Sequence, residues 1–297
     1  MNDNSGVISF ERTQTLNIKP SHSELKDVKI KCLQIDIETE EKIVCCTYSR
    51  QLYLVNMKAE AKPFGEKTTN FSQVSLPVHC AKINAMDVCI RKPLLATCSS
   101  DKTLKVWNYE ERTLEYNYTF AEEAFALAFH PSGLHCVVGF ADKIKIMNLF
   151  LDIKDQRREL KEISSKGYKE IRFSNGGHLF AVTCGNPQKI YVFNFYTGEN
   201  PSNFVFSGHS GKVRCLEWSK DDLYLFSCGT DGMLYQWRIS DGLRTDIIQK
   251  GPILNSVARS TDGNSLFIVS NDKRSLMEFN DNYEKRCDDG LIYTEVA

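Results

Sequence analysis

Short apolar runs separated by turn residues recur along this chain at a nearly constant interval. Two of the runs end in tryptophan and share one order of residue types, Ser100–Trp107 (SDKTLKVW) and Thr230–Trp237 (TDGMLYQW). Aligning the rest of the chain on the two tryptophans gives seven anchor positions: Phe10, Val55, Trp107, Met147, Phe193, Trp237 and Phe279. The steps between anchors are 45, 52, 40, 46, 44 and 42 residues, which indicates an internal repeat.

The side chains before each anchor support this alignment. Three residues before the anchor the side chain is aliphatic in all seven repeats: Val7, Leu52, Leu104, Ile144, Ile190, Leu234 and Leu276. Nine residues before the anchor, six repeats have small side chains, most of them cysteine: Cys46, Cys98, Val138, Cys184, Cys228 and Ser270. Small, readily buried side chains suit the crowded inner strand of a packed sheet, so we interpret these cysteines as core residues rather than ligands.

Turn residues also recur in a fixed place, 14 to 16 residues before an anchor. They are Pro93, Gly133, Gly177, Asp222 and Gly263. Between the turns lie short runs rich in Val, Ile, Phe, Tyr and Cys, which predict β-strands. A period of about 40–45 residues with four short strands per unit is the signature of a WD-repeat β-propeller. The sequence therefore predicts an all-β fold, and its seven anchors predict seven blades.

Six of the predicted repeats are complete, between about Val28 and Asn280. The seventh is divided between residues 3–19 and residues 283–297, with Gly290–Ala297 expected to supply an inner strand. Pairing of these N-terminal and C-terminal segments would close the propeller and leave only short exposed edges. We therefore expect residues 1–297 to form a single β-propeller domain.

Two sets of polar residues share one spacing and resemble a catalytic triad. The separations of 18, 4 and 6 residues occur twice, in His79, Thr97, Asp101 and Trp107 and in His209, Ser227, Asp231 and Trp237. A catalytic site is usually built once, whereas a hydrogen-bond relay that supports the fold recurs with the repeat. We therefore interpret both sets as structural tetrads, in which the carboxylate orients the imidazole, the imidazole reaches the hydroxyl, and the indole N–H completes the relay.

Composition and charge narrow the classes of function. The chain of 297 residues has 37 Lys+Arg against 38 Asp+Glu, without the basic excess expected of a nucleic-acid-binding protein. No apolar run approaches the roughly 20 residues of a membrane helix, and the N-terminus lacks the pattern of a signal peptide. The 11 cysteines form no CxxC pair, so we expect reduced thiols in the cytoplasm.

Motifs for cofactors and catalysis are also missing from the sequence. Gly208–Val213 contains a Gly-Lys pair but not the spacing of a phosphate loop, and neither HExxH nor GxSxG occurs. His130 and His135 flank one turn without a second ligand pair nearby in sequence. We predict no metal, no cofactor, no small-molecule substrate and no enzymatic activity.

A narrower resemblance rests on four segments: Phe129–Phe140 (FHPSGLHCVVGF), Ile146–Leu149 (IMNL), Phe173–Ala181 (FSNGGHLFA) and Gly208–Arg214 (GHSGKVR). They resemble the second propeller of the cilia- and flagella-associated protein 57 family of axonemal WD-repeat proteins. The resemblance implies a non-catalytic scaffold on the doublet microtubule of a cilium or flagellum, which helps to position inner-arm dynein and regulatory complexes. The alternative is a cytosolic adaptor, such as a substrate receptor of a ubiquitin ligase; an enzymatic propeller is more distant.

We expect protein partners to bind the loops on the narrow face of the propeller. The loops that enter inner strands, and the turns between second and third strands, carry these candidates: Lys82, Ser100, Phe140, Lys212 and Thr230. An exposed aromatic residue among lysines would anchor an acidic partner. The alternative for Phe140 is that its ring packs inward over the central channel.

Overall fold

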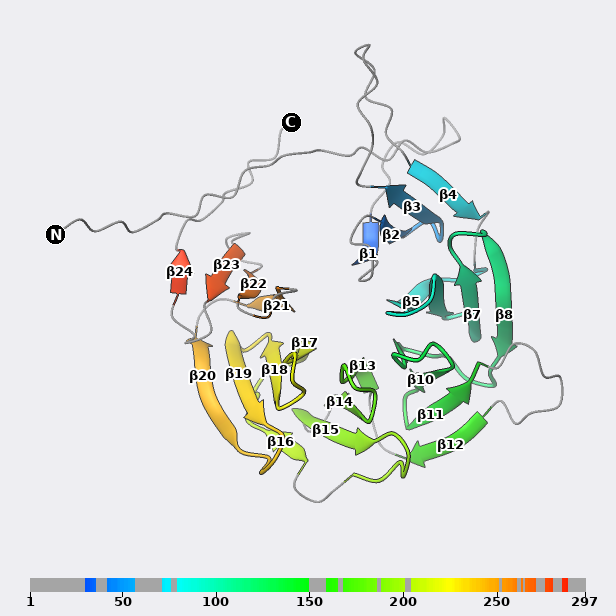
Figure 1. Cartoon of the computed structure of the whole chain (residues 1–297). Helices are drawn as coiled ribbons and strands as arrows, with labels where there is room; N and C mark the ends of the chain where they lie inside the picture. Colours follow the sequence, from blue (N-terminus) through cyan, green and yellow to red (C-terminus); the bar gives the residue numbers. More distant parts are fainter. Residues whose placement is uncertain are drawn as a thin grey trace, which may run out of the picture. The chain divides into compact units, whose positions relative to one another are not determined.

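The regular structure of the chain is entirely β in the residues that can be described. In this computed structural model they comprise 30–35, 42–56, 71–75, 79–149, 159–164, 168–185, 188–200, 204–250, 253–260, 263, 265–270, 276–279 and 285–287. These residues form 24 β-strands, arranged as six four-stranded sheets (Figure 1). Within them, no helix is long and apolar enough to cross a membrane.

The chain divides into two compact units, and the first, residues 14–171, contains three sheets. The first sheet consists of β1 (Ile30–Ile35), β2 (Lys42–Thr47), β3 (Leu52–Asn56) and β4 (Phe71–Ser75). The second consists of β5 (Ile83–Val88), β6 (Leu94–Ser99), β7 (Thr103–Asn108) and β8 (Thr113–Thr119). The third consists of β9 (Ala126–Phe129), β10 (His135–Gly139), β11 (Lys143–Asn148) and β12 (Glu159–Ser164).

The second unit, from residue 172 onward, contains the other three sheets. The first strand of the fourth sheet, β13, crosses the boundary between the two units. The fourth sheet consists of β13 (Tyr168–Phe173), β14 (Leu179–Gly185), β15 (Gln188–Asn194) and β16 (Val205–Ser207). The fifth consists of β17 (Val213–Trp218), β18 (Tyr224–Gly229), β19 (Met233–Arg238) and β20 (Arg244–Lys250). The sixth consists of β21 (Leu254–Arg259), β22 (Leu266–Ser270), β23 (Leu276–Phe279) and β24 (Lys285–Cys287).

Consecutive strands pair in each sheet, because short turns join them. In the fifth sheet, for example, Cys228 lies opposite Cys215 of β17 and Leu234 of β19, both in antiparallel register. All five turn residues that the sequence predicted lie in turns before a second strand, and four of them have a left-handed backbone, with φ between 58° and 86°: Gly133, Gly177, Asp222 and Gly263. A left-handed backbone is nearly free of strain for glycine and tolerable for aspartate, which explains these residue types.

The repeating apolar positions form the core, as the sequence predicted. The aliphatic position three residues before the anchor is at most 1% exposed in each repeat whose side chain is described: Leu52, Leu104, Ile144, Ile190 and Leu234. The position nine residues before the anchor is at most 4% exposed: Cys46, Cys98, Val138, Cys184, Cys228 and Ser270. Both positions therefore select buried side chains, and the interpretation of the four cysteines as core residues is confirmed.

Neighbouring sheets within a unit pack face to face through these positions. In the first unit, Cys46 and Leu52 belong to one buried apolar cluster with Trp107 and other residues of the second sheet. In the second unit, Cys228 and Leu234 belong to a buried cluster with residues of the sixth sheet. A sheet held between two neighbours buries both of its faces, which explains why β6 is buried along its whole length.

The number of blades differs from the prediction of seven. The described residues contain six four-stranded sheets, and the seventh anchor, Phe10, lies outside them, as do residues 3–19. Of the segment 283–297, residues Lys285–Cys287 are described, and they pair with β23 as the outer strand of the sixth sheet. The sixth repeat thus uses part of the sequence that we assigned to a seventh, because the outer strand of a blade follows its anchor. The single domain over residues 1–297 stays a prediction.

The burial of the thiols predicts their reactivity. Cys80 is exposed, whereas burial raises the pKa of Cys46 and of Cys98 to about 12. Because the thiolate is the reactive form, N-ethylmaleimide should modify Cys80 much faster than either buried thiol in the folded protein. Peptide mapping after a short exposure would measure this difference. Equal labelling of Cys98 and Cys80, without denaturant, would contradict the described packing.

Candidate functional site

The fifth sheet contains one complete tetrad. His209 Nδ1 lies 2.9 Å from Asp231 Oδ2, and His209 Nε2 lies 2.8 Å from Ser227 Oγ. The indole of Trp237 donates to the same hydroxyl at 2.8 Å. The side chains of His209 and Asp231 are 2% and 4% exposed. The four side chains therefore form one continuous hydrogen-bond relay inside the protein.

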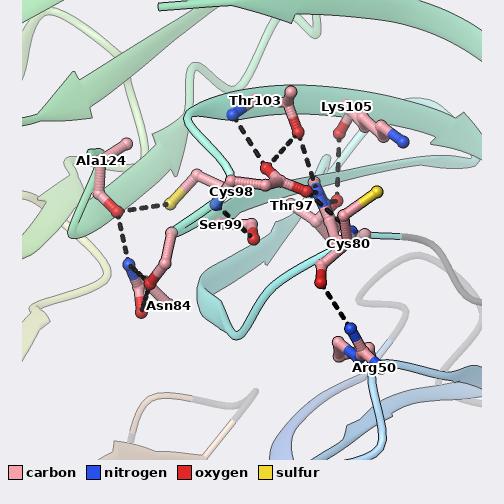
Figure 2. A network of polar contacts seen from close by, with 12 residues as sticks. Arg50, Cys80, Asn84, Thr97, Cys98, Ser99, Thr103, Lys105 and Ala124 are labelled. Carbon is pink, nitrogen blue, oxygen red and sulfur yellow. Dashed lines mark hydrogen bonds and ion pairs between the residues drawn. The ribbon is translucent and has the colours of Figure 1, made fainter. Parts of the chain in front are cut away.

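The second sheet contains the other tetrad with the same connectivity. His79 Nδ1 lies 2.9 Å from Asp101 Oδ2, and His79 Nε2 lies 2.8 Å from Thr97 Oγ1. The indole of Trp107 donates to Thr97 at 3.4 Å, which makes this bond the longest of the relay. Figure 2 shows Thr97 near Lys105, which lies opposite it on the neighbouring strand β7, and close to the segment that carries Cys80.

The chemistry of the partners places the protons in both relays. An ionised carboxylate can only accept, so Nδ1 of each histidine donates to its aspartate. Nε2 of the neutral ring then accepts from the hydroxyl, which itself accepts the indole N–H. Burial lowers the pKa of His79 and of His209 below the ordinary value, although the neighbouring aspartates oppose this change. Both rings are therefore neutral near pH 7.

The aspartates stay ionised in spite of their burial. Burial alone would raise the pKa of Asp101, but hydrogen bonds from Thr103 and the proximity of His79 outweigh it and lower the pKa to about 2. The pKa of Asp231 is also lowered, because His209 and the Met233 and Ser210 amides outweigh the effect of burial. Each tetrad therefore pairs a fixed negative charge with a neutral imidazole.

This arrangement does not favour nucleophilic catalysis. Ser227 Oγ is fully buried and already bonded to both the imidazole and the indole. A serine nucleophile needs an accessible oxygen from which the imidazole removes a proton as the oxygen attacks substrate. The geometry instead suits a support that links the loop before the first strand, the second strand and the third strand of one sheet.

Sequence reasoning missed several participants in the tetrads. The backbone amides of Cys80 and Ser210, each one residue after the histidine, both donate to the aspartate at 3.0 Å. A Cβ on Gly229 would lie 2.9 Å from Asp231 Oδ1 and 3.1 Å from His209 Nδ1, so glycine leaves room for the hydrogen bond between these two side chains. Thr103 has no counterpart in the other tetrad, where Met233 stands, and only its position two residues after Asp101 could have suggested its role.

Four of the five expected partner-binding residues form two matching pairs. In the first unit, the Ser100 amide donates to the Lys82 carbonyl at 2.9 Å. In the second unit, the Thr230 amide donates to the Lys212 carbonyl at 2.9 Å, and the Lys212 amide donates to Thr230 Oγ1 at 2.8 Å. Each pair joins the loop entering the first strand to the turn between the second and third strands. Both lysines are exposed.

Ser100 also belongs to a polar cluster that joins two neighbouring sheets. Asn84 Nδ2 donates to Glu123 Oε1 at 3.0 Å and to the Ala124 carbonyl at 2.8 Å. Ser100 Oγ donates to the same Glu123 oxygen. Figure 2 shows Asn84 and the Cys98 thiol both directed at the Ala124 carbonyl. Hydrogen bonds from Ser100 and Asn84 lower the pKa of Glu123, which therefore carries a negative charge close to Lys82.

The expectation of an exposed aromatic residue at position 140 is wrong. Phe140 is 1% exposed and packs edge-to-face against Phe120, with ring centroids 4.9 Å apart. Lys145 Nζ lies 5.9 Å from the Phe140 ring centroid. The ring is buried because Phe120 and Leu127 extend the core up to this turn of the third sheet. Phe140 thus belongs to the core and not to a partner-binding surface.

The described residues contain no group of three or more His, Cys, Asp or Glu side chains that could hold a metal ion. His130 and His135 lie with their ring centroids 5.8 Å apart. His130 Nδ1 contacts Ser132 Oγ at 2.8 Å within its own turn. This contact orders the turn that follows β9.

Comparison with known proteins identifies the repeat. The family described as "WD domain, G-beta repeat" matches residues 71–108 and 200–238, and each of these stretches contains one complete tetrad. The chain is a WD40-repeat β-propeller. Its other repeats lack the tetrad, as at Ala141, which occupies the aspartate position of the third sheet.

Similarity to individual proteins extends over most of this chain. The chain is 42% identical over 278 residues to "Cilia- and flagella-associated protein 57" of Mus musculus, which covers 93% of this chain and 21% of that protein. It is 46% identical over 202 residues, 68% of the chain, to "Cilia- and flagella-associated protein 57 A" of Tetrahymena thermophila. The C form of that organism is 38% identical over 273 residues. The chain spans about a fifth of the length of these homologues.

Proposed function

We propose that this WD40 propeller is a non-catalytic protein-interaction scaffold of the cilium or flagellum. The observation that carries the proposal is the 42% identity to a cilia- and flagella-associated protein over 93% of the chain. The two tetrads support it, since their buried hydroxyls serve the fold and leave no free nucleophile in either relay. The proposed partners are axonemal proteins: inner-arm dynein, regulatory complexes and the doublet microtubule.

The structure provides a physical basis for such a scaffold. Packed sheets hold the loops at their ends in fixed positions, so a partner can bind without a large entropic cost of ordering them. Lys82 and Lys212 project from these loops, and their exposed cations would attract acidic segments of a partner. We propose that Lys82, Ser100, Lys212 and Thr230 contribute to this contact.

The ciliary role can be tested by localisation. A tagged full-length protein that contains this chain should remain with axonemes after detergent extraction of ciliated cells. Deletion of residues 30–287 should release it or displace its neighbours in proximity labelling. Recovery of ubiquitin-ligase subunits from the cytosol, with no axonemal protein among the neighbours, would contradict the proposal and favour an adaptor.

Charge reversal at the loops should weaken partner binding without unfolding the chain. Lys82→Glu and Lys212→Glu each replace an exposed cation, so the melting temperature should change little, while axonemal proteins recovered with the bait should fall severalfold. Arg91→Glu is the matched control, because Arg91 is exposed in the turn between β5 and β6, at the other end of those strands. Equal recovery with the three variants would place the interface elsewhere.

A further inference from the structure

Three large apolar side chains are unusually exposed in the turns of the fourth and fifth sheets. Tyr196 is 72% exposed, Leu243 is 62% exposed and Leu223 is 56% exposed. All three lie in the second unit, and we call them the turn patch. Leu223 precedes β18, Leu243 precedes β20 and Tyr196 follows β15, so these residues share the end of the sheets opposite to the loops that carry Lys212 and Thr230.

Hydrogen bonds connect the residues of the turn patch. The carbonyls of Leu223 and Leu243 accept from the adjacent amides of Ile239 and Arg238, both at 2.9 Å, so the two leucines flank one short segment. Asp222, next to Leu223, reaches the fourth sheet and accepts from the Gly176 amide at 2.7 Å. The turn that contains Gly176 continues to His178, whose carbonyl accepts from Phe195, the residue before Tyr196.

The repeats themselves show that the fold does not require an apolar residue at two of these places, those of Tyr196 and Leu243. Three residues after the anchor, where Tyr196 stands, other repeats have Glu110 and Ser240. Six residues after the anchor, where Leu243 stands, other repeats have Thr113 and Glu199. Polar side chains are therefore compatible with both turns. A cluster of exposed apolar residues that the fold does not need is typical of a binding surface.

The charges around the turn patch favour a basic partner. The turns 196–199, 219–223 and 238–243 contain four carboxylates, Glu199, Asp221, Asp222 and Asp241, against two cations, Lys220 and Arg238. Arg238 is already paired with Asp241 at 3.0 Å. Asp222 accepts from Asn175 and Gly176, and Asp221 accepts from Ser219 and Leu223. The cation of Arg259, from the sixth sheet, also lies close enough to Asp221 to lower its pKa. With Arg259 counted, four carboxylates stand against three cations, so the patch keeps an excess of negative charge around its apolar centre.

The backbone of the patch argues against an extended peptide. The Leu223 and Leu243 amides donate to Asp221 and Asp241, both at 3.1 Å, and their carbonyls are also bonded. A strand that binds by backbone pairing needs unpaired groups at a sheet edge, and these residues offer none. A helix needs no backbone partner, because it recognises such a surface with side chains alone.

We propose that the turn patch binds an amphipathic helix whose apolar stripe is flanked by lysine or arginine. Apolar side chains of the helix would cover Tyr196, Leu223 and Leu243, while its cations would lie near Asp221 and Asp222. This second surface lies at the opposite end of the strands from Lys212 and does not depend on the ciliary role proposed above.

The test uses a fluorescent helical peptide of about 18 residues made of leucine and lysine, with leucine at i, i+3, i+4 and i+7. A second peptide has glutamate in place of lysine. Fluorescence anisotropy should show that the chain binds the lysine peptide at least about tenfold more tightly than the glutamate peptide, with an affinity that falls as salt rises. Absence of binding, or equal binding of the two peptides, would overturn the proposal.

Variants of the patch locate the binding. Tyr196→Ser, Leu223→His and Leu243→Thr each introduce the residue that another repeat of this chain has at that place: Ser240, His178 and Thr113. The triple variant should fold and lose at least about tenfold in affinity for the lysine peptide. Leu114→Thr is the matched control, because Leu114 is an exposed leucine on β8, outside the patch. An unchanged triple variant, or concentration-dependent dimerisation that the triple variant abolishes, would overturn the proposed occupant.

Discussion

Asp231→Ala should destabilise the chain more than any surface substitution in the same sheet. The carboxylate accepts hydrogen bonds from His209, from the Ser210 amide at 3.0 Å and from the Met233 amide at 3.3 Å. Removing it leaves a buried imidazole N–H and two amides without their acceptor, which costs about 3 kcal/mol of unfolding free energy. For a chain of 297 residues, that loss lowers the melting temperature by roughly 5 °C. Calorimetry and urea unfolding would measure it.

The control for this variant is Asp142→Ala. Asp142 is an exposed aspartate in the corresponding turn of the third sheet, so its removal should change the unfolding free energy by less than about 0.5 kcal/mol. An Asp231→Ala protein with unchanged stability would refute the structural interpretation of the tetrads. Loss of an enzymatic activity at full stability would do the same, because it would assign the relay to catalysis.

The repeat was the part of the fold that the sequence predicted best. A buried position inside a packed sheet admits few side chains, so Leu104 and Leu234 share an aliphatic type that can be recognised without an alignment. The same holds for the tetrads, since the lengths of the strands and turns in one blade fix the separations of 18, 4 and 6 residues. Local geometry that repeats leaves a periodic signal in the chain.

Features that depend on a single blade left no such signal. Phe140 occupies a turn position that is polar at Ser100 and Thr230, and only the structure shows Phe120 packed against it. The turn patch was missed for the opposite reason, because Leu223 and Leu243 resemble ordinary strand residues in the sequence while their side chains face solvent. An apolar residue in a sequence does not reveal whether a neighbour covers it.

The chain should lose stability on acidification below about pH 6.5, the ordinary pKa of histidine. Burial lowers the pKa values of His79, His209 and His135 in the folded protein. As the pH falls, the unfolded chain therefore takes up protons before the folded chain does, and the equilibrium shifts toward unfolding. Each such histidine can contribute up to about 1.4 kcal/mol per pH unit to this slope.

A second loss should follow below about pH 4, where carboxylates protonate in the unfolded chain. The folded-state pKa of Asp101 is about 2 and that of Asp231 is also lowered, so both aspartates stabilise the fold above their ordinary pKa and stop doing so as they are protonated. Chemical unfolding at a series of pH values would separate the two steps, because they lie on opposite sides of pH 5.

Glutamine variants test whether the loss of stability below about pH 6.5 arises from the histidines of the tetrads. His79→Gln and His209→Gln remove the groups that titrate, so the double variant should be less stable at pH 7.5 yet lose less stability between pH 7.5 and 5.5 than the natural chain. His135, which lies in neither tetrad and whose pKa is also lowered by burial, is present in both proteins and should contribute to the slope that remains. If the double variant kept the full slope, the proton uptake would arise elsewhere, and the assignment of neutral imidazoles to the two relays would be wrong.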